Sequence, residues 1–363
     1  MGRSAVLALF PCLQTTGGVQ QSGIIAWNAL ARQECLAASY FSYCRWPSTA
    51  HTGEPILGSQ DRLVHATSKA ATVRAALTGR WRATDIIVWH VSLLKLLPLF
   101  RLHPVRITLF LHGVEAWQRL DYITRAALRR VNLILTNSDY TWHRFLTLHP
   151  EQADTPHATV HLGLGDGPLP GETKPQAPPS ALMLSRLSRG EDYKGHREMI
   201  AAWPLVLERI PTAELWIAGD GDLRHELERL TRARGLEQYV RFWGYVAEEQ
   251  KEALLRRSRC LALPSRGEGF GLVYLEAMRL GRPCLVSTLD AGREVVNPPH
   301  AGLSAHPGDP VALADAICRL LSAEPEWQSW SQAARQRYES HFTASQFQQR
   351  LLRAWNDPAS SSG

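Results

Sequence analysis

The stretch Pro264-Ser-Arg-Gly-Glu-Gly-Phe-Gly-Leu-Val-Tyr-Leu-Glu-Ala-Met278 decides the expected fold of this 363-residue chain. It follows the apolar run Cys260–Leu263, which has the length of a buried strand, and its second half is rich in helix-forming residues. Between them, Gly269 and Gly271 allow a ligand to approach the backbone closely. A strand, a glycine-rich turn and a helix in this order are typical of open α/β sheets, which bind ligands at the carboxyl ends of their strands.

Two carboxylates in this stretch are candidates for ligand binding. Glu268 and Glu276 are eight residues apart, up to roughly 12 Å if the segment is helical throughout. That spacing lets one carboxylate contact a sugar while the other holds a ribose, and it is wide for a glycosidase pair, where ~5–10 Å is expected. The free N–H groups at the start of the new helix suit a phosphate. The stretch therefore predicts a site for a phosphorylated ligand.

Short apolar runs alternate with amphipathic segments along the rest of the chain, which predicts parallel, doubly wound sheets. The expected strands are Ala5–Leu9, Asp85–Trp89, Arg106–Leu111, Asn132–Thr136, Ala181–Leu184, Glu214–Ala218, Val240–Trp243, Cys260–Leu263 and Pro283–Val286. The expected helices include His196–Glu208, Leu223–Arg234, Glu249–Arg257, Pro325–Tyr338 and Ala344–Trp355.

The chain is long enough for two domains of ~150–200 residues. Gly163–Pro179 is crowded with glycine and proline, which is typical of a linker. We therefore expect an N-terminal domain over residues 1–168, a linker over 169–180 and a C-terminal domain over 181–342. A last helix, 343–357, is expected to cross back to the first domain.

Composition excludes several classes of protein. Hydrophobic residues make up 45% and charged residues 20% of the chain, as in globular proteins. The six cysteines contain no C-x-x-C pair, and no apolar run approaches the ~18–20 residues of a membrane span. The apolar run at residues 5–10 resembles a short signal peptide, but Pro11 interrupts it, so a first buried strand is the preferred interpretation and no targeting segment is expected.

The positive charge is concentrated in the N-terminal half. Residues 1–170 contain 16 lysines and arginines and 10 aspartates and glutamates, whereas residues 171–363 contain 24 of each. An anionic bilayer or a diphosphate-bearing lipid would suit this excess; no nucleic-acid-binding motif is present, so we expect no nucleic acid. Leu93–Arg101 and Ile123–Arg130 are the stretches that could contact a membrane. The alternative is that their leucines line the core and their arginines face water.

These features together resemble the family-4 retaining glycosyltransferases, which have the GT-B fold of two Rossmann-like domains facing across a cleft. The family's E-x7-E motif is present as Glu268 to Glu276. The resemblance implies that Glu268 contacts the transferred sugar and Glu276 the ribose hydroxyls. It also implies that the amides near Phe270, Gly271 and Leu272 contact the diphosphate of the donor.

Two further elements of the C-terminal half match the family in order. Arg186 and Lys194 resemble the R-L…K-G element that neutralises the diphosphate, although their spacing of eight exceeds the commoner five. The sequence leaves open whether they converge, and Arg189 could substitute. Phe242-Trp-Gly-Tyr-Val246 resembles the F-x-G-x-V segment that holds the base through backbone groups, which implies a donor-binding role at Val246.

The N-terminal half contributes a glycine loop and a histidine. Gly17 and Gly18 follow the first strand, where nearly bare backbone can approach a diphosphate, as the corresponding loop does in this family. The loop lacks the G-x-G-x-x-G pattern, so no nicotinamide cofactor is expected. His112, in His112-Gly-Val-Glu-Ala-Trp117, matches the family's active-site histidine near the reacting sugar. A single histidine outside such a context is usually structural.

Asp220-Gly-Asp222 matches the D-x-D metal motif of the other major glycosyltransferase fold. In this family a G-x-G turn occupies the same place, and Gly219 and Gly221 supply it. We therefore interpret the aspartates as turn and helix-cap residues and expect no metal and no cofactor.

The expected activity is retaining transfer of a hexose from a nucleotide diphosphate-sugar to a glycan or a polyprenyl-diphosphate-linked acceptor. The sequence is closest in its motifs to bacterial exopolysaccharide mannosyltransferases, which makes GDP-mannose the first donor, ahead of UDP-glucose and UDP-N-acetylglucosamine. The expected location is the cytoplasm, on the inner face of the cytoplasmic membrane. A sugar-nucleotide epimerase of the same fold and a non-catalytic nucleotide-sugar-binding protein remain alternatives.

Overall fold

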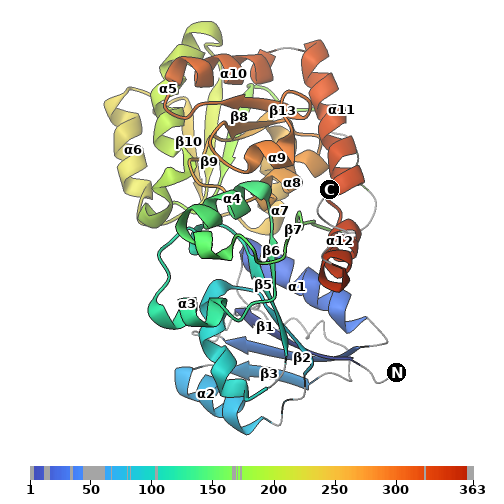
Figure 1. Cartoon of the computed structure of the whole chain (residues 1–363). Coiled ribbons are helices and arrows are strands. Elements are labelled where there is room, and N and C mark those ends of the chain that lie inside the picture. The colour runs from blue at the N-terminus through green and yellow to red at the C-terminus, as the bar shows by residue number, and fades with distance from the viewer. Residues whose placement is uncertain are drawn as a thin grey trace. The chain divides into compact units, whose positions relative to one another are not determined.

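The computed structural model describes residues 4–11, 17–32, 36–43, 62–66, 68–79, 81, 83–102, 105–165, 169, 171, 174–322 and 324–357. The chain divides into two compact units, residues 1–163 with 344–363, and residues 164–343. Each unit is built on one parallel sheet (Figure 1). The division after Gly163 lies ahead of the boundary expected at residue 168, so the segment 169–180 falls within the second unit.

The N-terminal unit has a seven-stranded sheet in the order β3-β2-β1-β4-β5-β6-β7, with every pair parallel. Its strands are β1 (Ser4–Pro11), β2 (Leu36–Tyr43), β3 (Arg62–Ala66), β4 (Asp85–Val88), β5 (Arg106–Leu111), β6 (Leu133–Thr136) and β7 (His157–Thr159). Its helices are α1 (Gly18–Ala31), α2 (Lys69–Thr78), η1 (Val91–Phe100), η2 (Val114–Ala116), α3 (Tyr122–Leu128), α4 (Asp139–Leu148), η3 (Pro150–Gln152) and α12 (Ala344–Asn356). The strand order reverses between β1 and β4, which is the switch point of this sheet.

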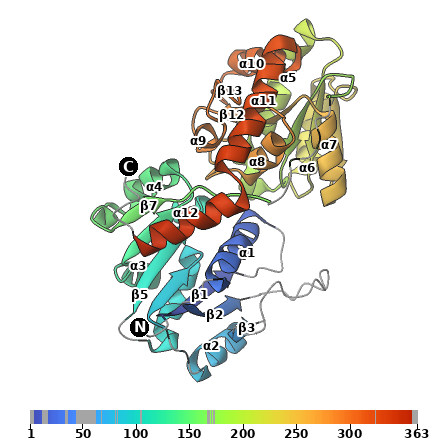
Figure 2. The same ribbon diagram turned by 90° about the vertical axis from the view of Figure 1, so that its right-hand side faces the viewer.

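The last helix, α12, packs on the N-terminal unit beside α1 (Figure 2). Gln348 donates a hydrogen bond to the carbonyl of Ile25 at 3.2 Å. Arg106, on β5, donates to the carbonyl of Trp355 at 2.9 Å, and its guanidinium lies over the Trp355 ring. These contacts anchor α12 to α1 and to strand β5 of the first sheet.

The C-terminal unit has a six-stranded sheet in the order β10-β9-β8-β11-β12-β13, again with every pair parallel. Its strands are β8 (Ser180–Leu184), β9 (Glu214–Ala218), β10 (Val240–Gly244), β11 (Cys260–Leu263), β12 (Cys284–Ser287) and β13 (Gly302–Ala305). Its helices are η4 (Arg189–Lys194), α5 (His196–Arg209), α6 (Arg224–Ala233), α7 (Glu248–Arg257), α8 (Leu272–Arg279), α9 (Gly292–Val296), α10 (Pro310–Ser322) and α11 (Glu324–His341). The switch point here lies between β8 and β11.

The expected doubly wound α/β architecture is confirmed for both sheets. The central strands β1, β4, β5, β6, β8, β9, β11 and β12 are short, largely buried apolar runs, as parallel sheets covered on both faces require. The run at residues 5–10 is part of strand β1, in which Val6 to Phe10 are fully buried, so the prediction of a first buried strand is also confirmed.

One of the two expected membrane-contact stretches is corrected by the structure. Residues 91–100 form η1, whose Leu93, Leu94 and Leu97 are buried in the core of the N-terminal unit. These three leucines therefore line the core, and Leu96 and Leu99 are half-buried against it. Among the described residues, no helix combines the length and the apolar character needed to cross a membrane.

Candidate functional site

Two loops of the C-terminal unit meet at its switch point. The first follows β8 and spans residues 185–195, and the second follows β11 and spans residues 264–271. The backbone N–H of Arg266 donates to the carbonyl of Tyr193 at 2.8 Å. Gly195 has a left-handed φ of 86°, and a Cβ atom built on it would lie 2.5 Å from the carbonyl oxygen of Pro264. Only glycine lets these two loops approach so closely.

Glu268 lies in the second of these loops and is half-buried. Its backbone is fixed by the loop after β12: its N–H donates to Asp290 Oδ2 at 3.2 Å, and its carbonyl accepts from Ala291 at 3.2 Å. Burial raises the pKa of Glu268 above its ordinary value, with the charge of Lys194 opposing this shift and that of Glu191 adding to it. The carboxylate therefore lies within the electrostatic reach of the loop after β8.

Asp290 is a site residue that the sequence reasoning missed. Its side chain is almost fully buried, and its Oδ1 accepts from the N–H of Gly292 at 2.9 Å. Burial raises the pKa of Asp290 to about 8, and the nearby charge of Glu268 adds to the effect. Its position directly after a strand, at the same sheet edge as Glu268, was the signal that could have identified it.

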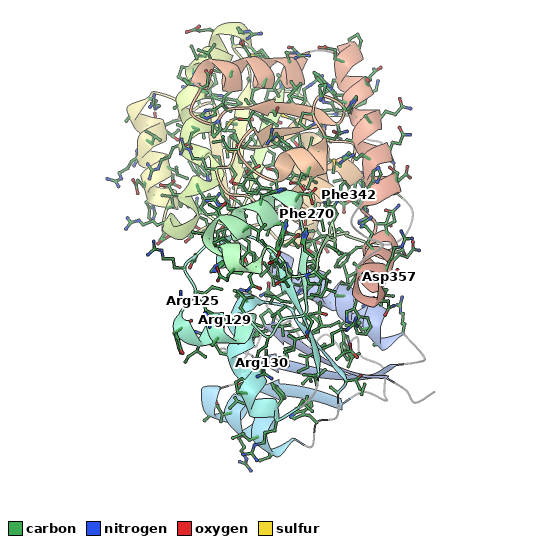
Figure 3. The ribbon with its side chains drawn as sticks, in the orientation of Figure 1. Arg125, Arg129, Arg130, Phe270, Phe342 and Asp357 are labelled. Atoms are coloured by element: carbon green, nitrogen blue, oxygen red, sulfur yellow. The ribbon has the colours of Figure 1, made fainter. Side chains whose placement is uncertain are left out.

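The N-terminus of α8 presents backbone amides at the same edge. Gly271 is the N-cap residue with a φ of 85°, and Leu272 is the first helical residue. The N–H groups of a first helical turn have no partner within the helix, which makes this position suitable for an anion. Phe270 itself is buried, with its ring centroid 6.0 Å from that of Phe342 (Figure 3), so only its backbone is placed to contact a ligand.

The structure brings Arg186 and Lys194 together, which their spacing of eight left open. Both cations bind one carboxylate: Arg186 Nη2 bonds Glu191 Oε1, and Lys194 Nζ lies 2.9 Å from Glu191 Oε2. Arg189 contributes through its backbone N–H, which donates to Asp222 Oδ1 at 2.9 Å. Glu191 was not identified from the sequence because acidic residues in loops are common.

The glycines of Gly219-Asp-Gly221 hold the turn after β9 against the loop after β8. A Cβ on Gly219 would lie 1.8 Å from the carbonyl oxygen of Ser185, and one on Gly221 would lie 2.3 Å from that of Leu187. Asp220 accepts from the N–H of Gly221 at 2.9 Å, so its interpretation as a turn residue is confirmed.

The helix-cap interpretation of the two aspartates is wrong. The N-cap residue of α6 is Leu223, and no side chain caps this helix. Asp222 accepts a hydrogen bond from the backbone N–H of Arg189 instead. Among the described residues, no three histidines, cysteines or acidic residues are grouped as metal ligands.

Glu276 extends the site along α8. Its Oε1 lies 2.8 Å from Nζ of Lys251 on α7, and each side chain is 17% exposed. Burial raises the pKa of Glu276, and the ammonium group of Lys251 opposes the shift. Lys251 was not identified from the sequence because a lysine on an amphipathic helix normally faces solvent.

Val246 is half-buried in the turn between β10 and α7, next to Tyr245, which is 75% exposed.

In the N-terminal unit, His112 follows β5 and is buried. Its Nε2 lies 2.9 Å from the carbonyl oxygen of Trp89, which can only accept, so Nε2 carries the proton. Burial, together with the nearby charge of His90, lowers the pKa of His112 to about 3. The imidazole is therefore neutral at pH 7, and its buried Nδ1, which has no partner among the described residues, is a hydrogen-bond acceptor.

Two polar side chains fix the backbone around His112. Glu115 Oε1 accepts from the N–H groups of His112 and Gly113 at 2.5 and 3.2 Å, and Asn137 Nδ2 donates to the carbonyl of His112 at 2.6 Å.

Gly17 is the N-cap residue and Gly18 the first residue of α1, which follows β1 at the switch point of this sheet. Residues 12–16, which complete the predicted glycine loop, lie outside the described residues.

Most of the C-terminal unit matches a known protein family. Residues 178–323 match the family described as glycosyl transferases group 1. The matched segment contains both glutamates, both cations and the α8 N-terminus described above.

Curated relatives match part of the chain and include a mannosyltransferase and a glycogen synthase. The phosphatidyl-myo-inositol mannosyltransferase of Mycobacterium leprae is 36% identical over 148 residues, which are 40% of this chain and 38% of that protein. The glycogen synthase of Mycobacterium tuberculosis is 34% identical over 169 residues, 47% of this chain and 40% of that protein. The chain thus spans about two fifths of the length of these relatives.

Solved structures resemble the whole chain. The Anabaena protein HepE, in complex with UDP and glucose, has a TM-score of 0.74 at 17% identity and covers 97% of this chain and 99% of its own. At this identity the likeness establishes the fold alone. The chain has the GT-B fold, with its group 1 region in the second of two parallel-sheet α/β units.

Proposed function

We propose that this protein is a retaining glycosyltransferase that moves a hexose from a nucleotide diphosphate-sugar to a glycan or lipid-linked acceptor. One observation carries the proposal: Glu268, Lys194 and the N-terminus of α8 lie on loops that meet at the switch point of a group 1 sheet. A carboxylate, a cation and helix amides in one place suit a sugar joined to a diphosphate.

The diphosphate is the group that this site is best equipped to hold. The amides of Gly271 and Leu272 face it from the start of α8, and Arg186 and Lys194 supply positive charge from the loop after β8. When the bond between sugar and phosphate breaks, negative charge grows on the departing diphosphate. Fixed cations and amides therefore stabilise the transition state more than the ground state.

Glu268 is the residue that we assign to the transferred sugar. Its loop is held by Asp290 and Ala291, which fixes the backbone that carries the carboxylate. In a retaining transfer the departing diphosphate accepts the proton of the acceptor hydroxyl on the same face of the sugar, so no separate general base is required. The protein supplies position and charge stabilisation, and the proposed reaction uses no metal or other cofactor.

The remaining residues are assigned to the two ends of the donor and to the acceptor side. Glu276 binds the ribose hydroxyls, with Lys251 holding its carboxylate, and Val246 lies at the base. In the N-terminal unit, we assign Nδ1 of His112 to a hydrogen bond from a sugar hydroxyl or from the acceptor, and the backbone at Gly17 and Gly18 to contact with the diphosphate.

GDP-mannose is our first donor, supported by the mannosyltransferase among the relatives. UDP-glucose and UDP-N-acetylglucosamine are the alternatives, and the complex of HepE with UDP and glucose supports the first of them. A thermal-shift panel of these three donors separates them. The proposed donor is the one that raises the Tm most at equal concentration.

The decisive activity test compares Glu268→Ala with the wild-type protein. We expect the variant to lose at least about 100-fold in transfer rate, the scale of removing one transition-state contact. Glu237→Gln, which changes an exposed glutamate after α6, is the control and should retain full activity. Wild-type turnover by Glu268→Ala would contradict the role. Donor consumption without any acceptor would instead indicate an epimerase, and donor binding without turnover would indicate a non-catalytic binding protein.

We also propose that the enzyme works in the cytoplasm as a peripheral protein on the inner membrane face, through α3. Tyr122 and Ile123 are 79% and 59% exposed, and Arg125, Arg129 and Arg130 lie exposed beside them (Figure 3). Exposed apolar side chains flanked by cations suit the surface of an anionic bilayer. Such a location would bring a polyprenyl-diphosphate-linked acceptor to the N-terminal unit.

Co-sedimentation with anionic phospholipid vesicles at low salt tests the membrane contact. Ile123→Ser should release most of the bound protein. Val311→Ser is a matched control, because Val311 on α10 is also 59% exposed and has no arginine cluster beside it on that helix. Equal binding by the two variants, or no binding by the wild-type protein, would contradict the contact.

A further inference from the structure

The two cations of the proposed diphosphate site are already paired with a carboxylate of the protein. Glu191 uses one oxygen for the guanidinium of Arg186 and the other for the ammonium of Lys194, which lies 2.9 Å away. The side chains of Glu191 and Lys194 are only 16% and 17% exposed. This is an engaged, largely buried ion pair, unlike a surface pair whose partners are well hydrated.

The arrangement resembles the one that a diphosphate would need. A carboxylate and a phosphate both present two oxygens to cationic donors, and guanidinium groups bind both with the same geometry. The hydrogen bond from Arg186 and the ion pair with Lys194 that Glu191 forms are therefore the interactions that a diphosphate would require. A diphosphate and the Glu191 carboxylate cannot both have them.

The surrounding chain permits Glu191 to leave. The segment η4 is kinked at Glu191, where φ and ψ are −118° and 20°, so this residue is outside a regular helix. Glu191 also has three rotatable side-chain bonds, so rotation alone can move the carboxylate. The side chain of Arg186 is 80% exposed, so it can rotate to bind an anion that enters from solvent.

Glu191 also acts electrostatically on the charged groups around it. Glu268 lies close enough to Lys194 and Glu191 for both charges to affect it. Without Glu191, nothing among the described residues would hold Arg186 beside Lys194, and the two cations would repel each other. With Glu191 in place, the cations are already assembled before the donor binds.

We propose that Glu191 is a built-in occupant of the diphosphate subsite, which holds Arg186 and Lys194 together in the donor-free protein and is displaced by the diphosphate of the donor. After transfer, the same carboxylate competes with the nucleoside diphosphate product for the two cations and speeds its release. This inference rests on the proposed function, because it concerns the same site.

The competing explanation is that Glu191 only braces the two cations and stays in place when the donor binds. The two explanations predict opposite changes in affinity. Removing a competitor tightens the binding of a diphosphate, whereas removing a brace weakens it. The sign of the change therefore decides between them.

Isothermal titration with inorganic pyrophosphate, UDP and GDP tests the proposal. We expect Glu191→Gln to bind pyrophosphate and the preferred nucleoside diphosphate at least about ten-fold more tightly than the wild-type protein does, and to release the nucleotide more slowly in stopped-flow displacement. Glu226→Gln is the matched control: it removes the same charge from α6, where Glu226 pairs with Arg197, and should bind within about two-fold of wild type. Equal or weaker binding by Glu191→Gln would overturn the proposal.

Two further variants keep the test decisive. If Glu191→Gln does not fold, Glu191→Asp keeps the charge on a side chain one methylene shorter, and tighter binding than wild type supports the proposal while weaker binding overturns it. Lys194→Met separates the two levels of the argument. If wild type and Lys194→Met bind pyrophosphate and nucleotides equally, the proposed diphosphate site itself is wrong. If binding needs Lys194 but Glu191→Gln does not tighten it, only the displacement by Glu191 is wrong.

Discussion

Substituting Gly195 by alanine should separate the two loops that form the proposed donor site. Gly195 is the point at which the loop after β8 contacts the loop after β11. Its left-handed φ of 86° strains any residue with a Cβ atom, at a cost of about 1–2 kcal/mol. Its Cβ atom would also lie 2.5 Å from the carbonyl oxygen of Pro264, where ordinary contacts begin at 3.4 Å.

The close contact determines the size of the effect. Removing the overlap requires the two loops to move apart by about 0.9 Å, and comparable overpacking in protein interiors costs about 1–3 kcal/mol. We therefore expect Gly195→Ala to destabilise the C-terminal unit by about 2–5 kcal/mol in all, adding the backbone strain. The same displacement moves Lys194 relative to Glu268, so donor binding should weaken along with stability.

Gly235→Ala is the matched control. Gly235 has a similar φ of 66°, but nothing lies within 4 Å of the position its Cβ atom would take. It should show the backbone strain alone, about 1–2 kcal/mol, and normal donor binding. Urea unfolding of both variants, with titration of the preferred nucleotide sugar, measures the difference. If Gly195→Ala is no less stable than Gly235→Ala and binds the donor normally, the two loops do not meet as described.

Three other predictions concern pH, metal and the ribose end of the donor. Burial, aided by the charge of Lys194, lowers the pKa of His196 from 6.5 to about 4. Between these pH values the unfolded chain binds a proton that the folded protein does not, so stability is lost as the pH falls through this range. The Tm of the wild-type protein should fall more steeply from pH 6.5 to 4 than that of His196→Gln; parallel profiles would exclude His196 as the cause. EDTA should leave the transfer rate unchanged. Loss of transfer activity in the presence of EDTA would contradict the metal-independent mechanism. Lys251→Met should raise the KM for the donor several-fold with little change in kcat, because it releases Glu276 and leaves the sugar end intact; a loss confined to kcat would place Lys251 nearer the reacting bond.

Local sequence was sufficient to predict the centre of the C-terminal unit. The stretch from Pro264 to Met278 contains its strand end, glycine turn and helix start in consecutive residues, so its fold depends little on distant contacts. The predicted strands at Arg106–Leu111, Glu214–Ala218 and Cys260–Leu263 coincide with β5, β9 and β11. Each is a short apolar run, which is the signal that a buried parallel strand produces.

The strands that were missed lack that signal. β2 contains two alanines and two serines in eight positions, and β3 includes an arginine and a histidine in five. β7 and β13 have three and four residues and lie at the sheet edges, where burial imposes less on the sequence. Their places in the sheets come from pairing with strands that are distant along the chain.

The missed site residues have the same explanation. Asp290 reaches the Glu268 loop from 22 residues away, and Lys251 reaches Glu276 from 25. Glu191 lies near Arg186 and Lys194 in sequence, but its pairing with both cations is visible only in the folded segment η4. Motif spacing identifies residues that meet a ligand, whereas the residues that hold those groups in place become visible only after folding.

A crystal structure of the protein with its preferred nucleotide sugar tests the central claim most directly. We predict that the diphosphate lies within hydrogen-bonding distance of Lys194 and the amides of Gly271 and Leu272, with the hexose at Glu268 and the ribose at Glu276. A donor bound elsewhere, or one whose diphosphate leaves these groups unoccupied, would contradict the account.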